Sequence, residues 1–405
     1  MRKTLSCALL ALLCVTALSQ DMNHRLKNWD SSYPGVEVLD NEVLSFMQQW
    51  QLKGLSLSVV RNDSLVFSKG YGWADEEASE SMRPGSIMRV ASVSKLITAA
   101  GIMVLVDRGE LSLGDKLFTK DGILKEFNSY VKDSAALAIT VENLLRHEAG
   151  FDERSFDPMF ATEQVIKHFG LKKAPDTSEL LRCMLGKNLG FYPGTDRHYS
   201  NFCYAILSLV IETVTGHPYE EWMQKNVLHP AGCYDMHIGG NYFSQRLPGE
   251  VRYYPAKNNE KSREYNASGK IVNRSYGGSD ITALQGAGGW VASTPELARL
   301  VASINGCSIL PDIISKASVD EMTRYYDDKT YPLGWISVSP DKVWTRSGTL
   351  AGTTALIRVF PDGDCWVMVT NTGTWKGPHF YQYSRELLSR CRDLSYYSLP
   401  YHNLF

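Results

Sequence analysis

The sequence lacks an excess of charge of either sign. Lys and Arg together number 42 and Asp and Glu number 44, which leaves a formal net charge of −2 over 405 residues. A nucleic-acid partner is therefore not supported, because such binding depends on a surplus of basic side chains that neutralise phosphates. Low-complexity runs and clear internal repeats are also absent. What is present, 44% hydrophobic and 21% charged residues, is typical of a soluble globular protein with a large core.

The chain also lacks the cysteine and histidine spacings of a metal site. It has eight cysteines, and no two of them form a CxxC motif. Two lie in the first 19 residues, and the others are scattered at Cys183, Cys203, Cys233, Cys307, Cys365 and Cys391. A zinc site is not expected from this pattern, and nothing indicates another metal or an organic cofactor. The six scattered cysteines either pair as disulfides in an exported chain or stay as buried thiols.

Long apolar runs are absent except at the N-terminus. There, Arg2 and Lys3 precede the apolar residues 5–18, and Ala17-Leu18-Ser19 supplies the small residues that a signal peptidase recognises. Residues 1–19 are therefore predicted to be a secretory signal peptide, with an uncleaved anchor as the alternative. We expect a secreted or periplasmic protein with no stable membrane span after signal cleavage.

Segments with strand character lie towards both ends of the chain, and helical segments fill the middle. Strands are predicted at residues 55–60, 64–70, 332–338, 343–347, 354–360 and 365–370, and the main helices at residues 38–51, 92–108, 201–215 and 381–391. The simplest packing is an α+β fold. One antiparallel β-sheet is built from N- and C-terminal segments and flanked by helices, and a mainly helical second lobe is added to it.

This packing predicts one domain over residues 20–405. Its α/β lobe is expected at about 38–110 and 285–395, and its helical lobe at about 111–284. A substrate cleft is expected between the two lobes. The polar residues 250–280 are predicted to be a surface excursion near that cleft.

The first candidate for chemistry is Ser92-Val93-Ser94-Lys95. Residues three apart share a helix face, so the Ser92 hydroxyl and the Lys95 amine can meet. The helix that follows is apolar nearly all round, and burial there would lower the pKa of Lys95 and make its amine a usable base. Two other Ser-x-x-Lys matches, at residues 129–132 and 339–342, do not open such a helix and are treated as chance.

The second candidate is Tyr199-Ser200-Asn201, which follows a turn and precedes an apolar helix. A tyrosine near cations has a lowered pKa and can carry the serine proton. Asn201 can donate to a substrate carbonyl and help to orient Lys95. For Tyr199 taken alone, the alternative is an ordinary half-buried tyrosine.

The third candidate is Arg346-Ser347-Gly348, which ends a strand and is followed by Thr349. A glycine lets a substrate backbone lie along the strand edge. The Thr349 amide can join the Ser92 amide as an oxyanion hole. Arg346 stays protonated, so it can hold a carboxylate or raise the local positive potential, but it cannot act as a base. The alternative is a surface arginine on an exposed strand.

Together these motifs resemble those of the serine β-lactamase and penicillin-binding-protein superfamily. The likeness is greatest to the branch of class C β-lactamases, D,D-carboxypeptidases, D-aminopeptidases and related esterases. The motifs occur in the family's order, and residues 55–75, 144–150 and 288–294 resemble further family segments, so that the resemblance spans about 38–389. Arg346 departs from the Lys or His that is usual there, which weakens the case for β-lactam hydrolysis more than the case for serine chemistry.

The resemblance implies a β-lactamase/transpeptidase-like fold. It also implies a serine hydrolase that forms an acyl-enzyme with amide, peptide or ester substrates, of the D-amino-acid peptide, esterase or β-lactam type. The expected catalytic residues are Ser92, Lys95 and Tyr199, and the expected substrate or oxyanion residues are Asn201, Arg346, Ser347, Gly348 and Thr349. The alternative is a catalytically inactive scaffold that binds or senses a small molecule or peptide. The oligomeric state and the substrate stay open.

Overall fold

The computed structural model describes residues 22–153, 155–307, 309–327 and 329–405. The predicted signal peptide, residues 1–19, lies outside these ranges. Among the helices within them, none has the length and apolar content that crossing a bilayer would require.

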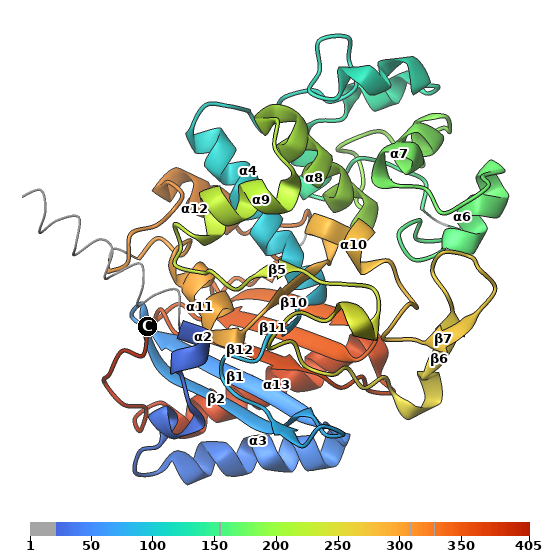
Figure 1. The fold of residues 1–405 in the computed structure, drawn as a ribbon. Coiled ribbons are helices and arrows are strands. Elements are labelled where there is room, and N and C mark those ends of the chain that lie inside the picture. Colours follow the sequence, from blue (N-terminus) through green and yellow to red (C-terminus); the bar gives the residue numbers. More distant parts are fainter. Residues whose placement is uncertain (1–21, 154, 308, 328) are drawn as a thin grey trace, which may run out of the picture.

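A seven-stranded antiparallel sheet forms the centre of the fold, in the order β3-β2-β1-β12-β11-β10-β9 (Figure 1). The N-terminal strands are β1 (Gly54–Arg61), β2 (Ser64–Asp75) and β3 (Glu80–Ser81), and the C-terminal strands are β9 (Ser337–Val338), β10 (Trp344–Leu350), β11 (Thr353–Val359) and β12 (Cys365–Thr370). The two groups join where β1 pairs with β12, from Leu55 opposite Thr370 to Val60 opposite Cys365. This confirms the predicted α+β fold class and the sheet built from both chain ends.

Local sequence explains the β1–β2 hairpin. Arg61 pairs with Ser64, which leaves Asn62 and Asp63 as a two-residue turn. Both turn residues have positive φ angles, 48° and 56°. Asn and Asp tolerate this left-handed conformation best after glycine, and a turn of this kind matches the twist of paired strands.

Helices bury both faces of the sheet. Helices α3 (Val36–Trp50) and α13 (Phe380–Ser395) pack on one face, while α4 (Ser94–Asp107) and α11 (Thr294–Ala302) pack on the other (Figure 1). Along β12, Trp366 and Met368 pack in the core under α3 and α13, whereas Val367 and Val369 pack in the core under α4 and α11. Strand side chains alternate in direction, so a strand buried on both faces needs a continuous apolar run, as β12 has.

The other described elements lie mostly between the two sheet-forming ends of the chain. The helices are α2 (Met22–Arg25), α5 (Val141–Leu145), α6 (Thr162–Phe169), α7 (Thr177–Leu185), α8 (Asn201–Thr215), α9 (Tyr219–Met223), α10 (Ile281–Leu284) and α12 (Lys316–Met322). The small sheets are β4 (Met88–Arg89), β8 (Trp290–Ala292) and β5 (His237–Ile238), and the pair β6 (Lys261–Arg263) and β7 (Ile271–Asn273). Helix α8 has the bounds that the sequence predicts, with Ser200 capping its start and Gly216 ending it at φ 70°.

One predicted strand is mostly wrong. The sequence predicts a strand over residues 332–338, but only Ser337 and Val338 pair, as β9. The preceding apolar residues, Leu333 and Trp335, are buried in the core next to α4. Between them Gly334 has φ +77°, and a Cβ added there would lie 2.6 Å from the Ala99 Cβ. The segment is apolar because it packs against a helix, not because it joins the sheet.

The predicted excursion over residues 250–280 is partly anchored. Val251 and Tyr253 are buried, and the Tyr253 hydroxyl accepts a hydrogen bond from the Arg89 amide at 2.8 Å. The exposed part is the hairpin of β6 and β7. The chain is held at its start and again near its end, where Arg89 Nη1 donates to the Ser275 carbonyl at 2.6 Å, and the hairpin projects between them.

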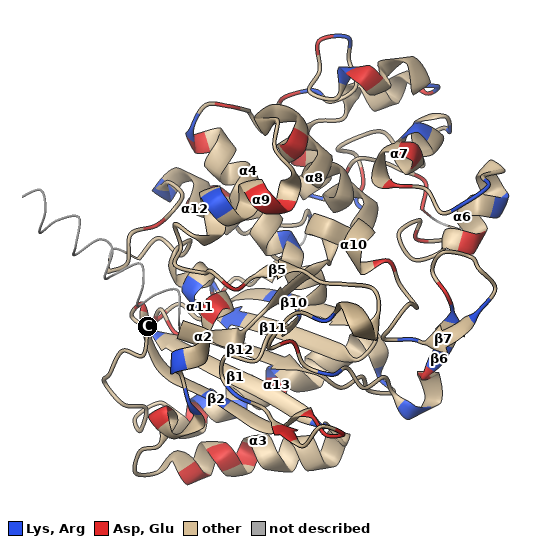
Figure 2. Ribbon diagram, viewed as in Figure 1, with Lys and Arg blue, Asp and Glu red and all other residues tan. Residues whose placement is uncertain are grey.

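Acidic and basic side chains are interspersed over the fold. In the view of Figure 2 both signs occur over most of the fold, while helix α3 carries acidic residues alone. This distribution agrees with the formal net charge of −2.

The two-sided burial of β12 predicts a large effect of cavity formation. Trp366 is 0% exposed, so Trp366→Ala should lower the free energy of unfolding by about 3–5 kcal/mol, measured by guanidinium denaturation. Trp29 is 72% exposed, and Trp29→Ala should change it by less than about 0.5 kcal/mol. Equal stability of the two variants would contradict this packing.

Candidate active site

Ser92 lies at the turn that leads into α4. It is the middle residue of a short 3-10 helix, η2 (Ala91–Val93), directly before α4 begins at Ser94. Ala91 has φ +49°, a strained angle for a residue with a side chain. Ser92 is partly exposed while its neighbours are buried. The turn therefore presents the Ser92 hydroxyl at the surface of an otherwise closed core.

Lys95 is fully buried, and its amine is surrounded by acceptors. It donates to the Ser92 hydroxyl at 3.3 Å, to Asn201 Oδ1 at 2.7 Å and to the Ala287 carbonyl at 2.5 Å. Three acceptors match the three protons of an ammonium group. Burial nevertheless lowers the pKa of Lys95, opposed by Tyr199 and assisted by the positive charge of Arg346.

Tyr199 lies between two cations. Arg346 Nη2 donates to the Tyr199 hydroxyl at 3.1 Å, and the Lys95 amine lies 5.1 Å from the centre of the Tyr199 ring. Burial alone would raise the pKa of Tyr199, but the charges of Lys95 and Arg346 and hydrogen bonds with Ser92 and Lys95 lower it to about 8. The two cations therefore favour the phenolate form of Tyr199.

Arg346 reaches two parts of the site from β10. Besides Tyr199, it contacts the backbone of the nucleophile turn, because its Nε donates to the Ser92 carbonyl at 2.7 Å. The side chain is 1% exposed, and its Nη1 has no hydrogen-bond partner among the described residues. Arg346 is therefore not the exposed surface arginine of the alternative, and it keeps one donor open.

Gly348 allows β10 to pass directly beside Ser92. A Cβ added at Gly348 would lie 2.4 Å from the Val90 carbonyl oxygen and 2.7 Å from the Ser92 amide nitrogen. No side chain fits in that space, so glycine is needed there. Thr349 is the next residue along this strand, and the oxyanion hole of the Ser92 and Thr349 amides stays a prediction. Ser347 and Thr349 are both partly exposed.

The structure thus brings Ser92, Lys95, Tyr199, Asn201 and the strand from Arg346 to Thr349 into one site. Asn201 is 9% exposed, and its side-chain oxygen accepts a hydrogen bond from Lys95. The catalytic and binding roles of these residues stay predictions.

Sequence reasoning missed Asp157. Its Oδ2 accepts a hydrogen bond from Asn201 Nδ2 at 2.6 Å, so Asp157, Asn201 and Lys95 form a chain of hydrogen bonds. The negative charge of Asp157 raises the pKa of Lys95 against the effect of burial. Asp157 lies in a loop with no recognisable motif, so its part in the site becomes visible only from its contact with Asn201 in the folded chain.

His147 and Glu153 also support the Tyr199 segment. His147 Nδ1 accepts a hydrogen bond from the Ser200 amide at 3.1 Å, and its ring lies 4.5 Å from that of Tyr199. Burial and the charges of Lys95 and Arg346 hold the pKa of His147 well below its usual range, so the ring is neutral. Burial raises the pKa of Glu153 to about 8, and its carboxyl group is hydrogen-bonded to the Ser200 hydroxyl. His147 belongs to residues 144–150, while no pattern in the sequence indicated Glu153.

Cys203, Cys233, Cys365 and Cys391 are buried free thiols, as one of the two alternatives proposed. Within the described ranges, no three His, Cys, Asp or Glu side chains are grouped so as to hold a metal ion.

Comparison with known proteins identifies similar sequences and folds. A family model described as Beta-lactamase matches residues 39–388. Esterase EstB of Burkholderia gladioli is 30% identical over 194 residues, 47% of this chain and 48% of the esterase. The match thus spans about half the length of this curated relative.

Solved structures extend the likeness to the fold. The D-amino acid amidase from Ochrobactrum anthropi SV3 superposes with a TM-score of 0.68 at 18% identity, covering 89% of this chain and 99% of the amidase. The octameric penicillin-binding protein homologue from Pyrococcus abyssi has a TM-score of 0.62 at 21% identity, covering 88% of this chain and 77% of that one. At these identities the comparison concerns the fold alone.

The two cations around Tyr199 predict a pH effect. If the phenolate is the base, the labelling rate of Ser92 by a fluorophosphonate should rise with pH through about 8. Arg346→Gln removes a charge that lowers the Tyr199 pKa, so the rise should move to higher pH. Labelling at pH 7 should then slow by roughly tenfold for each unit of that shift. Arg346→Lys keeps the charge and should stay nearer to the wild type. An unmoved profile in Arg346→Gln would contradict the role of Tyr199.

Asp157 predicts a shift on the alkaline side of the same profile. Asp157→Asn keeps a hydrogen-bond acceptor for Asn201 but removes the charge that raises the pKa of Lys95. The Lys95 ammonium stabilises the phenolate, so the labelling rate should fall where that ammonium loses its proton, and in Asp157→Asn this fall should begin at lower pH. Exposed Asp121 provides the control, because Asp121→Asn removes the same charge at the surface. Identical alkaline limbs in the two variants would exclude this role for Asp157.

Proposed function

This chain belongs to the beta-lactamase family, and on that premise we propose that it is an exported serine hydrolase in which Ser92 forms an acyl-enzyme. The observation that carries the proposal is the convergence of three groups from distant parts of the chain. The Lys95 amine donates to the Ser92 hydroxyl, and Arg346 donates to Tyr199 while also holding the Ser92 carbonyl. Activation of a serine needs a nucleophile, a base and a group that orients the base.

Acylation starts with a proton transfer. The Tyr199 phenolate takes the proton of the Ser92 hydroxyl as Oγ bonds to the substrate carbonyl carbon. The carbonyl oxygen becomes an oxyanion that accepts hydrogen bonds from the Ser92 and Thr349 amides. When this intermediate collapses, the bond to the leaving nitrogen or oxygen breaks. The proton on Tyr199 passes to that atom, which leaves Ser92 acylated.

Hydrolysis of the acyl-enzyme repeats the sequence with water. Tyr199 takes a proton from the water as its oxygen adds to the ester carbonyl. The bond from the carbonyl carbon to Ser92 Oγ then breaks, and the proton returns to Oγ. Lys95 keeps its three acceptors throughout and stabilises the negative charge on Tyr199 and on Oγ.

Amide, peptide and ester substrates suit this chemistry. The similar proteins support this range, since one is an esterase and another a D-amino acid amidase by name. The open Nη1 of Arg346 is a buried donor at the site, and a carbonyl or carboxylate oxygen of the substrate would satisfy it. The signal-like residues 1–19 support a secreted or periplasmic location.

Labelling and hydrolysis test the proposal together. Wild-type protein should react with a fluorophosphonate at Ser92 and hydrolyse at least one of p-nitrophenyl acetate, a D-alanine p-nitroanilide or nitrocefin. Ser92→Ala should lose the label and lower kcat/KM by about 10³-fold or more. The matched control is Ser129→Ala, since Ser129 belongs to a Ser-x-x-Lys match with no such site. Folded wild-type protein that neither labels nor hydrolyses would favour a binding or sensing module instead.

A further inference from the structure

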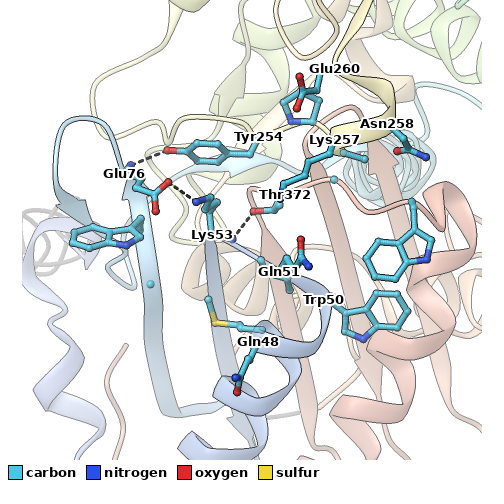
Figure 3. Close-up of a pocket in the computed structure, with 18 residues that line it drawn as sticks. Gln48, Trp50, Gln51, Lys53, Glu76, Tyr254, Lys257, Asn258, Glu260 and Thr372 are labelled. Atoms are coloured by element: carbon cyan, nitrogen blue, oxygen red, sulfur yellow. Dashed lines mark hydrogen bonds and ion pairs between the residues drawn. The ribbon is translucent and has the colours of Figure 1, made fainter.

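A large cavity lies at the end of the central sheet, away from Ser92. Its volume is about 970 Å³, within the range of small-molecule sites. It lies where β1 begins and β12 has ended, and the end of α3 and residues 254–260 close its sides (Figure 3). The residues proposed above for catalysis do not line it, so its chemistry needs an explanation of its own.

Aromatic rings dominate the apolar part of this cavity. The rings of Trp50 and Trp375 lie 5.0 Å apart, and Trp73 and Tyr254 line the same space. Trp375 is 56% exposed and Trp73 is 38% exposed. Exposed tryptophans gathered in one hollow mark a binding surface, because each offers a large rigid face that water solvates poorly.

The polar part of the cavity is rich in amides and balanced in charge. Gln48 and Gln51 line it from the end of α3, and Lys257, Asn258 and Glu260 line it from one loop (Figure 3). Lys53 and Glu76 pair with each other at 2.5 Å, so neither offers a free charge. A fatty acid or another apolar anion would find no net positive charge here. A neutral ligand with apolar faces and a hydroxylated edge fits better, and a sugar ring has that form.

A smaller hollow adjoins the cavity on the side of β10. This second hollow of about 230 Å³ shares Pro255, Ala256 and Gly373 with the first. Its lining includes Thr349, which follows Gly348, the residue that passes beside the Ser92 amide. The two hollows thus adjoin along these three residues, and the second reaches the strand that passes beside Ser92.

We propose that the cavity lined by Trp50, Trp73 and Trp375 binds a saccharide, and that the acyl group reaching Ser92 is carried by that saccharide. Binding of the sugar stands on the cavity alone. The assignment of an acylated saccharide as substrate rests on the proposed function.

Binding is measured in Ser92→Ala protein, so that no turnover is needed. Cellotriose, maltotriose and chitotriose are titrated to about 10 mM, a range that detects weak sites, and followed by calorimetry and tryptophan fluorescence. At least one should bind. Trp375→Ala in the same background should weaken its affinity about tenfold or more, and Trp73→Ala should do so independently. Trp29→Ala removes an exposed tryptophan outside the cavity and should leave the affinity within about twofold.

Two results would overturn the inference. One is that none of the three saccharides binds. Binding of sodium dodecanoate without saccharide binding would mark the cavity as a fatty-acid site and would count as the same result. The other is that Trp375→Ala and Trp73→Ala both bind as tightly as the parent. These results are separate from the serine chemistry. Fluorophosphonate labelling of the wild type without saccharide binding removes only this inference, and saccharide binding without labelling removes only the hydrolase.

Discussion

The site depends on one interaction, the burial of the Lys95 amine with a full set of acceptors. An ammonium group without partners costs several kcal/mol to bury, so its position is stable only while those acceptors are held in place. The acceptors come from three segments, the turn at Ser92, the start of α8 at Asn201 and the carbonyl of Ala287. The same hydrogen bonds that make the burial of Lys95 possible therefore fix α4 and α8 relative to each other and aim the amine at the nucleophile.

Arg346 places a second positive charge near the buried Lys95. With Lys95 fully buried, a second cation beside Tyr199 lowers the pKa of both groups. A guanidinium can do this while bonding two partners at once, the Ser92 carbonyl and the Tyr199 hydroxyl, because its donors form a rigid fork. Arg346, which departs from the family pattern, thus bridges the Ser92 carbonyl and the Tyr199 hydroxyl with two nitrogen atoms, whereas a lysine has only one nitrogen for both.

The pairing of the two chain ends decides where these groups meet. Strand β12 bridges β1 and β11, and β10 follows at the side where η2 turns into α4. Gly348 lets that strand approach the Ser92 amide. At the same end of the sheet, across β11 and β12, the residues before β1 and after β12 line the tryptophan-rich cavity. One sheet therefore carries both the candidate nucleophile site and the proposed saccharide site.

The sequence by itself determined what depends on neighbouring residues. Local stereochemistry explains the three-residue spacing of Ser92 and Lys95, the Asn62-Asp63 turn and the bounds of α8. It also explains the wrong strand prediction over residues 332–338, because apolar content alone does not distinguish contact with a helix from strand pairing. Only the tertiary structure decided that Asp157 would support Asn201, that Glu153 would bond to Ser200 and that Trp50 and Trp375 would share a cavity. These partners lie tens to hundreds of residues apart, and such contacts leave no periodic trace in a chain because they arise only when its core packs.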